Sequence, residues 1–185
     1  QISESVDNTK TEWTIYEAEK GTWPEGMVSI DSNHEGFTGS GFVNTANKLN
    51  AYFDMVVEAD VSGAYTVKIY YANGSDSNRP IQLSVNESIQ FTEIHCPSNS
   101  WKIWDFTTIC LNLKKGSNTI RFASVDPQLG IKGLANIDKI AISNNVRSTI
   151  YSLDIKNAGL GTVLINPVKK KYATDEVVEL KAVKS

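Results

Sequence analysis

Apolar and polar residues alternate along most of this chain, and no other feature of the sequence restricts its fold as strongly. The apolar members of five such runs are Phe53, Met55 and Val57; Tyr65, Val67, Ile69 and Tyr71; Ile81, Leu83 and Val85; Ile109, Leu111 and Leu113; and Ile120 and Phe122. Turn-forming residues separate the runs, and helical periodicity is almost absent. Short strands spaced by roughly 8 to 16 residues are typical of an antiparallel sandwich or barrel, which we place at residues 12–143.

Composition and charge argue against several other classes of protein. The 185 residues are 41% hydrophobic and 21% charged, as in ordinary soluble domains. The net charge is −3 and the densest basic cluster is only Lys169 to Lys171, so we expect no nucleic-acid partner. No apolar run approaches the ~18 residues of a transmembrane helix, and the N-terminus lacks the pattern of a signal peptide. We therefore expect no membrane partner, and either a cytosolic protein or one whose leader has been removed.

Three carboxylates occupy positions where a β-sandwich core should be apolar. Alternation predicts that Glu17 and Glu19 share a strand face with Trp13 and Ile15. Asp138 likewise shares a predicted strand face with apolar neighbours. Buried carboxylates about 7 Å apart on one strand repel one another and lose hydration, so they persist only if something neutralises them.

A hard cation is the simplest partner for these groups, and Ca2+ is the most plausible one because it prefers oxygen ligands. The glycine-rich segment 38–41 offers backbone carbonyls that can turn toward an ion. The alternative is an edge strand whose two glutamates are solvated. The residues alone leave both interpretations open.

The two cysteines leave their pairing undecided. Cys96 and Cys110 flank a predicted hairpin centred near residues 101–103, so a disulfide between them is geometrically conceivable. The alternative is two unpaired thiols.

Loops of the predicted sandwich divide into two sets if successive strands run up and down. One end would collect the segments 32–38, 73–79, 97–101 and 125–135. The other end would collect the segments 45–50, 60–63, 86–88 and 114–116. The first set is longer and richer in aromatic, amide and charged residues, so we expect the binding site at that end. His34 and His95 form no metal or catalytic set and are interpreted as structural or solvated.

Several segments, in order, resemble a family 35 carbohydrate-binding module, a family related to family 6 modules. They are YEAE, GFTGSGFVN, AYFDMVVEADVSGAYTVKIYYANG, RPIQLSVNE, SWKIW, LNLKKGSNTIRF and NIDKIAIS, which together span about residues 13–143. The resemblance implies a jelly-roll β-sandwich with a structural Ca2+, attached to secreted bacterial enzymes that degrade plant cell walls. It assigns Glu17, Glu19 and Asp138 as calcium ligands, with carbonyls of the segment from Thr38 to Gly41.

The same resemblance implies a sugar site. Trp101 matches an aromatic residue that stacks on a pyranose ring, and Asn136 matches an amide that hydrogen-bonds sugar hydroxyls. Arg79 is a candidate for pairing with a sugar carboxylate, since several members bind uronic acids with the help of a second Ca2+. Further candidates are Asn33 and Phe37 for the sugar, and Asp31 and Asn33 for the second ion. The alternatives are a packing role for Trp101, a turn cap at Asn136, and a surface ion pair of Arg79 with Asp76.

The tail from residue 150 to 185 changes in character. Its GLGTV segment, followed by Asn166-Pro167 and VVEL, resembles the opening half of a small β repeat that links modules in secreted bacterial proteins. We therefore predict an N-terminal tail at 1–11, a linker at 144–149 and a partial repeat at 150–185, within a longer polypeptide. The alternative is a strand pair that packs on the sandwich.

The function expected from these features is that of a non-catalytic, calcium-dependent module. It would bind glucuronic or unsaturated galacturonic acid of plant cell-wall polysaccharide and target a linked pectin- or hemicellulose-degrading enzyme, as a secreted monomer. One alternative is a glycoside hydrolase-like domain that uses Glu17 and Glu19, whose carboxylates would need to lie ~5 to 9.5 Å apart. A protein-binding adhesion domain is the other.

Overall fold

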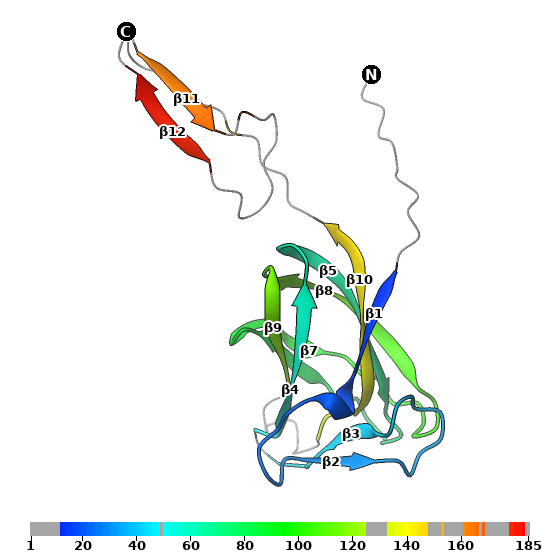
Figure 1. Cartoon of the computed structure of the whole chain (residues 1–185). Coiled ribbons are helices and arrows are strands. Elements are labelled where there is room, and N and C mark those ends of the chain that lie inside the picture. The colour runs from blue at the N-terminus through cyan, green and yellow to red at the C-terminus, as the bar shows by residue number, and fades with distance from the viewer. Residues whose placement is uncertain are drawn as a thin grey trace.

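The computed structural model describes residues 12–48, 50–124, 133–147, 153, 161–166, 168 and 178–183. Within these residues the fold is all-β apart from one turn of 3-10 helix, η1 (Ala18–Lys20). Two antiparallel sheets form a β-sandwich (Figure 1). The predicted all-β, antiparallel architecture is therefore confirmed.

The larger sheet has six strands, with β10 at its centre. Its order is β2 (Val28–Asp31), β3 (Phe42–Thr45), β10 (Asn136–Arg147), β5 (Gly63–Ala72) and β8 (Asp105–Leu113), and β1 (Trp13–Glu17) also pairs with β10. The smaller sheet has the order β4 (Tyr52–Ala59), β9 (Gly116–Ser124), β6 (Ile81–Val85) and β7 (Ser88–Ile94). Every pairing in both sheets is antiparallel.

The core lies between the sheets and is built from the alternating apolar residues. Val67 and Ile69 of β5 are fully buried, whereas Lys68 between them is not. Within the smaller sheet, Phe53 of β4 stacks on its cross-strand partner Phe122 of β9, with ring centroids 4.8 Å apart. Burial of each such side chain stabilises the fold by roughly 1.5–3 kcal/mol. The predicted period-two strands are confirmed.

The hairpin between β6 and β7 turns on two residues of positive φ. Asn86 has φ 49° and Glu87 has φ 68°, the combination that a type I′ turn requires. Asn86 is held to β9, because its N–H donates to the Thr119 carbonyl (2.9 Å) and its Oδ1 accepts from the Thr119 N–H (3.0 Å). These bonds fix the turn against the neighbouring strand.

The segment 95–104 is not the predicted hairpin. β7 pairs with β6 in the smaller sheet, whereas β8 pairs with β5 in the larger sheet, so the segment crosses from one sheet to the other. The prediction was wrong because turn signals reveal that a strand ends, but not which sheet the next strand joins. Cys96 is buried, Cys110 is exposed, and both are free thiols.

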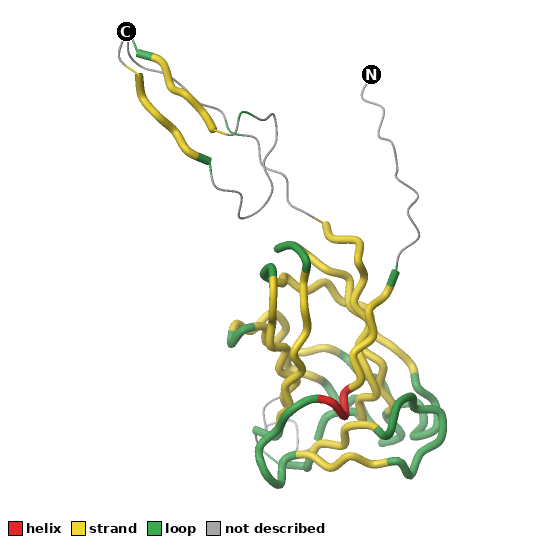
Figure 2. Tube along the Cα trace, in the orientation of Figure 1, coloured by secondary structure: helices red, strands yellow, loops and turns green. Residues whose placement is uncertain are grey.

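The ends of the sandwich also differ from the prediction at one segment. Segment 45–50 lies at the same end as the long loops: Asn47 Oδ1 accepts from Arg79 Nη2 (2.7 Å) and from the Gly133 N–H (2.6 Å). Strands β2 and β3 lie across this end, so the chain leaves β3 without returning to the other end (Figure 1). Figure 2 shows most of the loops gathered there. We call it the loop end; of the predicted loop 125–135, residues 125–132 lie outside the described residues.

The tail contains a separate two-stranded sheet. β11 (Thr162–Asn166) pairs antiparallel with β12 (Glu179–Val183). Strand β10 continues to Arg147, where it still pairs with Ala64 of β5, and so it reaches into the segment predicted as a linker. The domain boundaries and the β-repeat identity of the tail stay predictions. None of the helical structure in the described residues is long and apolar enough to span a membrane.

Candidate functional site

Trp101 lies at the loop end, on the segment that crosses between the sheets. Its indole stacks on the imidazole of His34, with ring centroids 5.6 Å apart and planes 9° apart. His34 in turn stacks on the buried Phe42, at 5.5 Å and 10°. Trp101 as a whole residue is half-buried. The sequence indicated only that His34 is structural or solvated; its stacking on Trp101 was not predicted, because the two residues are distant in the sequence and no local pattern links them.

Gly74 allows the Trp101 ring to lie against the main chain. A Cβ atom placed on Gly74 would lie 2.5 Å from the Trp101 backbone nitrogen and closer still to the indole. Real Cβ atoms do not approach other atoms so closely. Any side chain at position 74 would therefore displace Trp101.

The side chain of Arg79 is buried at the loop end, where it connects two other segments of the chain. Only 8% of the residue is exposed, and its Nε donates to the Gly133 carbonyl at 2.9 Å while Nη2 donates to Asn47. Its guanidinium carbon lies 5.5 Å from the centroid of the Trp101 ring. Burial lowers the pKa of Arg79 from its ordinary value, since desolvation disfavours the charged form. These two hydrogen bonds connect Arg79 to the segments that contain Gly133 and Asn47, and no pattern in the sequence predicts them.

Buried amides tie the loops together beside Trp101. Asn73 is fully buried and its Nδ2 donates to the carbonyls of Ser77 (2.9 Å) and Cys96 (2.8 Å), while its own carbonyl accepts from the Asn99 N–H (2.7 Å). Asn136, at the start of β10, is buried opposite Ala72, the residue before Asn73. The predicted sugar residues Trp101, Arg79 and Asn136 thus converge on the same end.

The other predicted sugar residues lie on the neighbouring loop. Phe37 is half-buried and packs edge-on against Phe42, with ring centroids 5.6 Å apart. Asn33 is exposed in the turn after β2. Asp31, proposed with Asn33 for a second ion, accepts a hydrogen bond of 2.7 Å from Asn44 Nδ2.

Glu17, Glu19 and Asp138 gather around the turn 38–40, and we call these three residues the acidic cluster. The Thr38 N–H donates to Asp138 Oδ1 (2.8 Å), and Thr38 Oγ1 lies 3.0 Å from Glu17 Oε2. Glu19 Oε1 accepts from the Ser40 N–H at 2.9 Å. The close approach is possible because Gly39 has φ 69° and no side chain; a Cβ there would clash with Glu19 Oε1 and lie 3.2 Å from Glu19 Cδ.

The positions of Glu17 and Glu19 differ from the prediction that both lie on one inward strand face. Strand β1 ends at Glu17, and Glu19 lies on the 3-10 turn η1 rather than on the strand. The face that Glu17 shares with Ile15 is the outer one, since Ile15 is 47% exposed. The prediction was wrong for Glu19 because the alternating pattern was extended beyond the end of β1. It was wrong for Glu17 because this face of β1 was taken to point into the core. Asp138 is 2% exposed, so its predicted burial is confirmed.

The acidic cluster has the donor chemistry that a hard cation requires. Glu19 Oε2 is buried without a hydrogen-bond partner among the described residues, and such an atom requires compensation. Lys139 Nζ supplies one positive charge, at 3.5 Å from Asp138 Oδ2. In the described part of the chain, no three acidic, histidine or cysteine side chains are arranged as a closed metal site. The carboxylates of the acidic cluster would therefore have to move closer together to coordinate an ion. A Cβ on Gly41 would meet the Asp31 carbonyl at 2.8 Å, so the end of this segment packs on β2.

Comparison with solved structures identifies close relatives of the sandwich. A family 35 carbohydrate-binding module from Clostridium thermocellum is 30% identical, with a TM-score of 0.65, over 71% of this chain and 97% of that module. A family 35 module in complex with a disaccharide containing glucuronic acid is 31% identical, with a TM-score of 0.61, over 69% of this chain and 91% of that one. The likeness confirms the predicted jelly-roll sandwich. No family model matches the chain.

Sequence relatives are large carbohydrate-active enzymes. An exo-beta-D-glucosaminidase from Amycolatopsis orientalis is 35% identical over 128 residues, which are 69% of this chain and 12% of that enzyme. Endo-1,4-beta-xylanase B from Cellvibrio japonicus is 35% identical over 116 residues, which are 62% of this chain and 19% of that enzyme. The chain therefore spans less than a fifth of either enzyme.

Proposed function

Since this chain belongs to the family 35 carbohydrate-binding modules, we propose that it binds uronic acids of plant cell-wall polysaccharide at the loop end without catalysing their cleavage. The observation that carries this proposal is the half-buried Trp101, held at the loop end by Gly74 and His34. A solved relative with 31% identity is in complex with a disaccharide that contains glucuronic acid, which supports the choice of ligand.

The chemistry of the loop end suits an acidic sugar. An indole face packs against the C–H groups of a pyranose ring, and an amide such as that of Asn136 both donates to and accepts from sugar hydroxyls. The buried guanidinium of Arg79 beside Trp101 adds a positive potential that attracts a carboxylate. One stacking contact with a few hydrogen bonds corresponds to binding in the micromolar to millimolar range, about −4 to −8 kcal/mol.

Calcium is part of the proposal. Ca2+ bound by Glu17, Glu19 and Asp138, with carbonyls of the segment 38–41, would satisfy the buried Glu19 oxygen and neutralise the acidic cluster. An ion there would hold η1 and the turn 38–40 together. Asp31 and Asn33 are proposed for a second ion near the sugar.

The role of the whole polypeptide follows from the covered part of the relatives. A module that spans less than a fifth of a carbohydrate-active enzyme raises the local concentration of its linked catalytic domain at the substrate. We place it in a secreted enzyme that degrades pectin or hemicellulose, as a monomer. Catalysis by Glu17 and Glu19 is disfavoured, because both carboxylates are engaged by the turn 38–40 through hydrogen bonds rather than left free to reach a substrate.

Isothermal titration calorimetry tests the binding proposal. We expect glucuronic acid and unsaturated digalacturonate to bind in Ca2+, xylobiose to bind at least tenfold more weakly, and Trp101→Ala to weaken uronate binding about 5- to 150-fold, equivalent to ~1 to 3 kcal/mol. The exposed Thr108→Ala serves as the matched control. Uronate affinity unchanged in Trp101→Ala, or measurable release of product from pectin, would contradict the proposal.

A further inference from the structure

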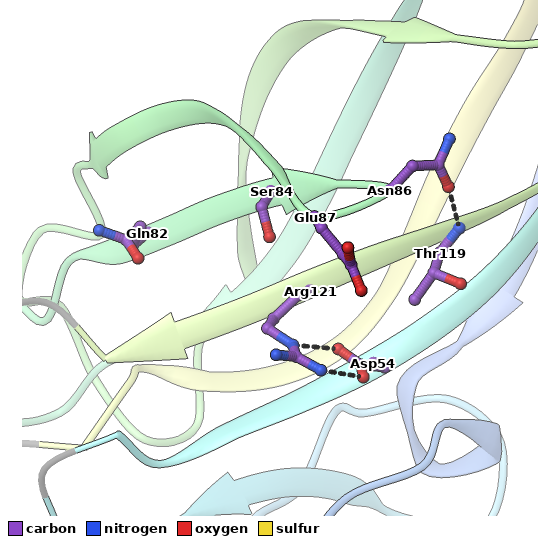
Figure 3. Close-up of a pocket in the computed structure, with 7 residues that line it drawn as sticks. All are labelled: Asp54, Gln82, Ser84, Asn86, Glu87, Thr119 and Arg121. Carbon is purple, nitrogen blue, oxygen red and sulfur yellow. Dashed lines mark hydrogen bonds and ion pairs between the residues drawn. The ribbon is translucent and has the colours of Figure 1, made fainter.

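A polar pocket of about 820 Å³ lies on the outer face of the smaller sheet (Figure 3). Its floor consists of Asp54 of β4, Gln82 and Ser84 of β6, and Thr119 and Arg121 of β9. These positions alternate with the core residues of the same strands, so they face away from the core. The volume is in the range of ~300–1,000 Å³ that is usual for small-molecule sites.

The turn between β6 and β7 completes the pocket with Asn86 and Glu87. Glu87 carries a full side chain at φ 68°, a left-handed conformation that is unfavourable for residues other than glycine. The bonds between Asn86 and Thr119 hold the turn in place. Figure 3 shows the Glu87 side chain directed toward Arg121 and Asp54.

Arg121 and Asp54 form a rigid pair at the base of the pocket. Arg121 Nε and Nη2 donate to the two carboxylate oxygens of Asp54, both at 2.8 Å. The guanidinium carbon also lies 3.8 Å from the centroid of the Tyr52 ring. This bidentate pair cancels its own charge and fixes the positions of its remaining polar atoms.

Three other polar side chains of the pocket have no hydrogen-bond partner within the described residues. The side chains of Gln82, Ser84 and Glu87 make no hydrogen bond with any other residue that the structure describes. Gln82 and Ser84 are half-buried on a rigid sheet, so a ligand could satisfy them without ordering a loop. Hydroxyl and amide groups both donate and accept hydrogen bonds, which matches the hydroxyls of a sugar.

The charge of the pocket selects among sugars. Asp54 and Arg121 cancel, and Glu87 leaves a net formal charge of −1, which repels a uronic acid. Tyr52 is covered by Arg121, so recognition would depend on hydrogen bonds rather than on stacking. We propose that this pocket is a second carbohydrate site, distinct from the loop end, that takes a neutral oligosaccharide chain. The proposal relies on the proposed function only for the class of ligand.

Nuclear magnetic resonance of the full 15N-labelled chain tests this site directly. Cellohexaose, xylohexaose, mannohexaose and isomaltohexaose are titrated separately up to about 10 mM, because a site without stacking is expected to bind near the millimolar range. At least one of them should shift the backbone amides of residues 82–84 and 119–121. Trigalacturonic acid should not shift these amides. No sheet-face shifts with any neutral chain, or equal shifts with trigalacturonic acid, would overturn the proposal.

Two variants separate this site from the loop end. Gln82→Ala combined with Ser84→Ala should weaken the neutral-sugar response at least tenfold, and Ser84→Tyr, which fills the pocket, should abolish it. Trp101→Ala and the exposed Thr108→Ala should leave it unchanged. If the double variant fails to fold, Ser84→Tyr decides: an unchanged response there overturns the proposal. Loss of uronate binding in Trp101→Ala with a persisting sheet-face response would show that the two sites are independent.

Discussion

Gly74 and His34 determine how Trp101 is presented, although neither residue carries an obvious binding group. Gly74 leaves the space that the indole fills, and His34 stacks on the indole ring. The binding role of Trp101 therefore depends on residues that would not be selected by chemistry alone.

Gly74→Ala should reduce uronate binding as strongly as Trp101→Ala. The added Cβ would meet the backbone nitrogen of Trp101 at 2.5 Å, and a backbone atom cannot move aside as a flexible side chain can. Overpacking of this kind costs about 1–3 kcal/mol of folding stability. Calorimetry and thermal melting together check the prediction.

Gly116→Ala provides the matched control for that experiment. Gly116 has φ 89°, but a Cβ there would meet nothing within 4 Å. Alanine at this position should therefore lower stability through the backbone alone, by about 1–2 kcal/mol, and leave uronate binding intact. Full binding in Gly74→Ala would mean that the position of Trp101 does not matter.

The two cysteines should differ sharply in reactivity. Burial raises the pKa of the Cys96 thiol from 9.0 to about 12, and the thiolate is the reactive form. Cys110 is exposed on the outer face of β8. At pH 8, Ellman's reagent should therefore release one equivalent of product quickly and the second only after unfolding. Cys110→Ser should remove the fast phase, and two fast equivalents would contradict the buried position of Cys96.

For individual residues, the sequence predicted burial and position in the fold better than it predicted contact partners. The burial of Asp138 and the loop-end position of Trp101 followed from alternation and turn order. The partners of Arg79 and the stacking of His34 did not, because Gly133, Asn47 and Trp101 approach them only through tertiary packing.

Among the elements, the turn 38–40 depends most on charge. It brings three carboxylates together beside the positive charge of Lys139, and one buried glutamate oxygen has no hydrogen-bond partner among the described residues. Alternation misplaced Glu17 and Glu19, because β1 ends at Glu17 and the face that Glu17 shares with the exposed Ile15 is the outer one. Strand periodicity gives no information about where a strand ends or bulges.

Removal of calcium should lower the melting temperature. Saturating metal, at about 100 times its dissociation constant, contributes ~2.7 kcal/mol to the folded state, and EDTA would remove that contribution. Glu19→Gln should weaken the response to Ca2+, whereas Glu58→Gln on the exposed side of β4 should preserve it. Differential scanning calorimetry with and without EDTA measures the effect. Identical melting curves after exhaustive chelation would remove the structural-ion proposal.

For the whole molecule, the sandwich and the β11–β12 hairpin should be energetically independent. The hairpin strands pair only with each other among the described strands, and an isolated two-stranded hairpin is marginally stable at best. A chain that ends at residue 147 should therefore keep the melting temperature and the uronate affinity of the full chain. A drop of more than a few degrees would show that the tail packs on the sandwich, which is the alternative considered from the sequence.

The place of β10 in the larger sheet has a consequence for the order of folding. β10 is the last strand of the sandwich to be synthesised, yet it pairs with β1, β3 and β5, from the first half of the sandwich. Until it emerges, β3 can pair with β2 and β5 with β8, but nothing joins these pairs and β1 into one sheet. Such long-range pairing is typical of slow folding.

A nascent chain of this protein should therefore stay unfolded until its final strand is released, and then fold in a single cooperative step. Truncation at residue 135, just before β10, should abolish the cooperative thermal transition that truncation at 147 preserves. Late closure of this kind would keep the polypeptide extended while it is still being made, a state in which it can be passed through a narrow channel.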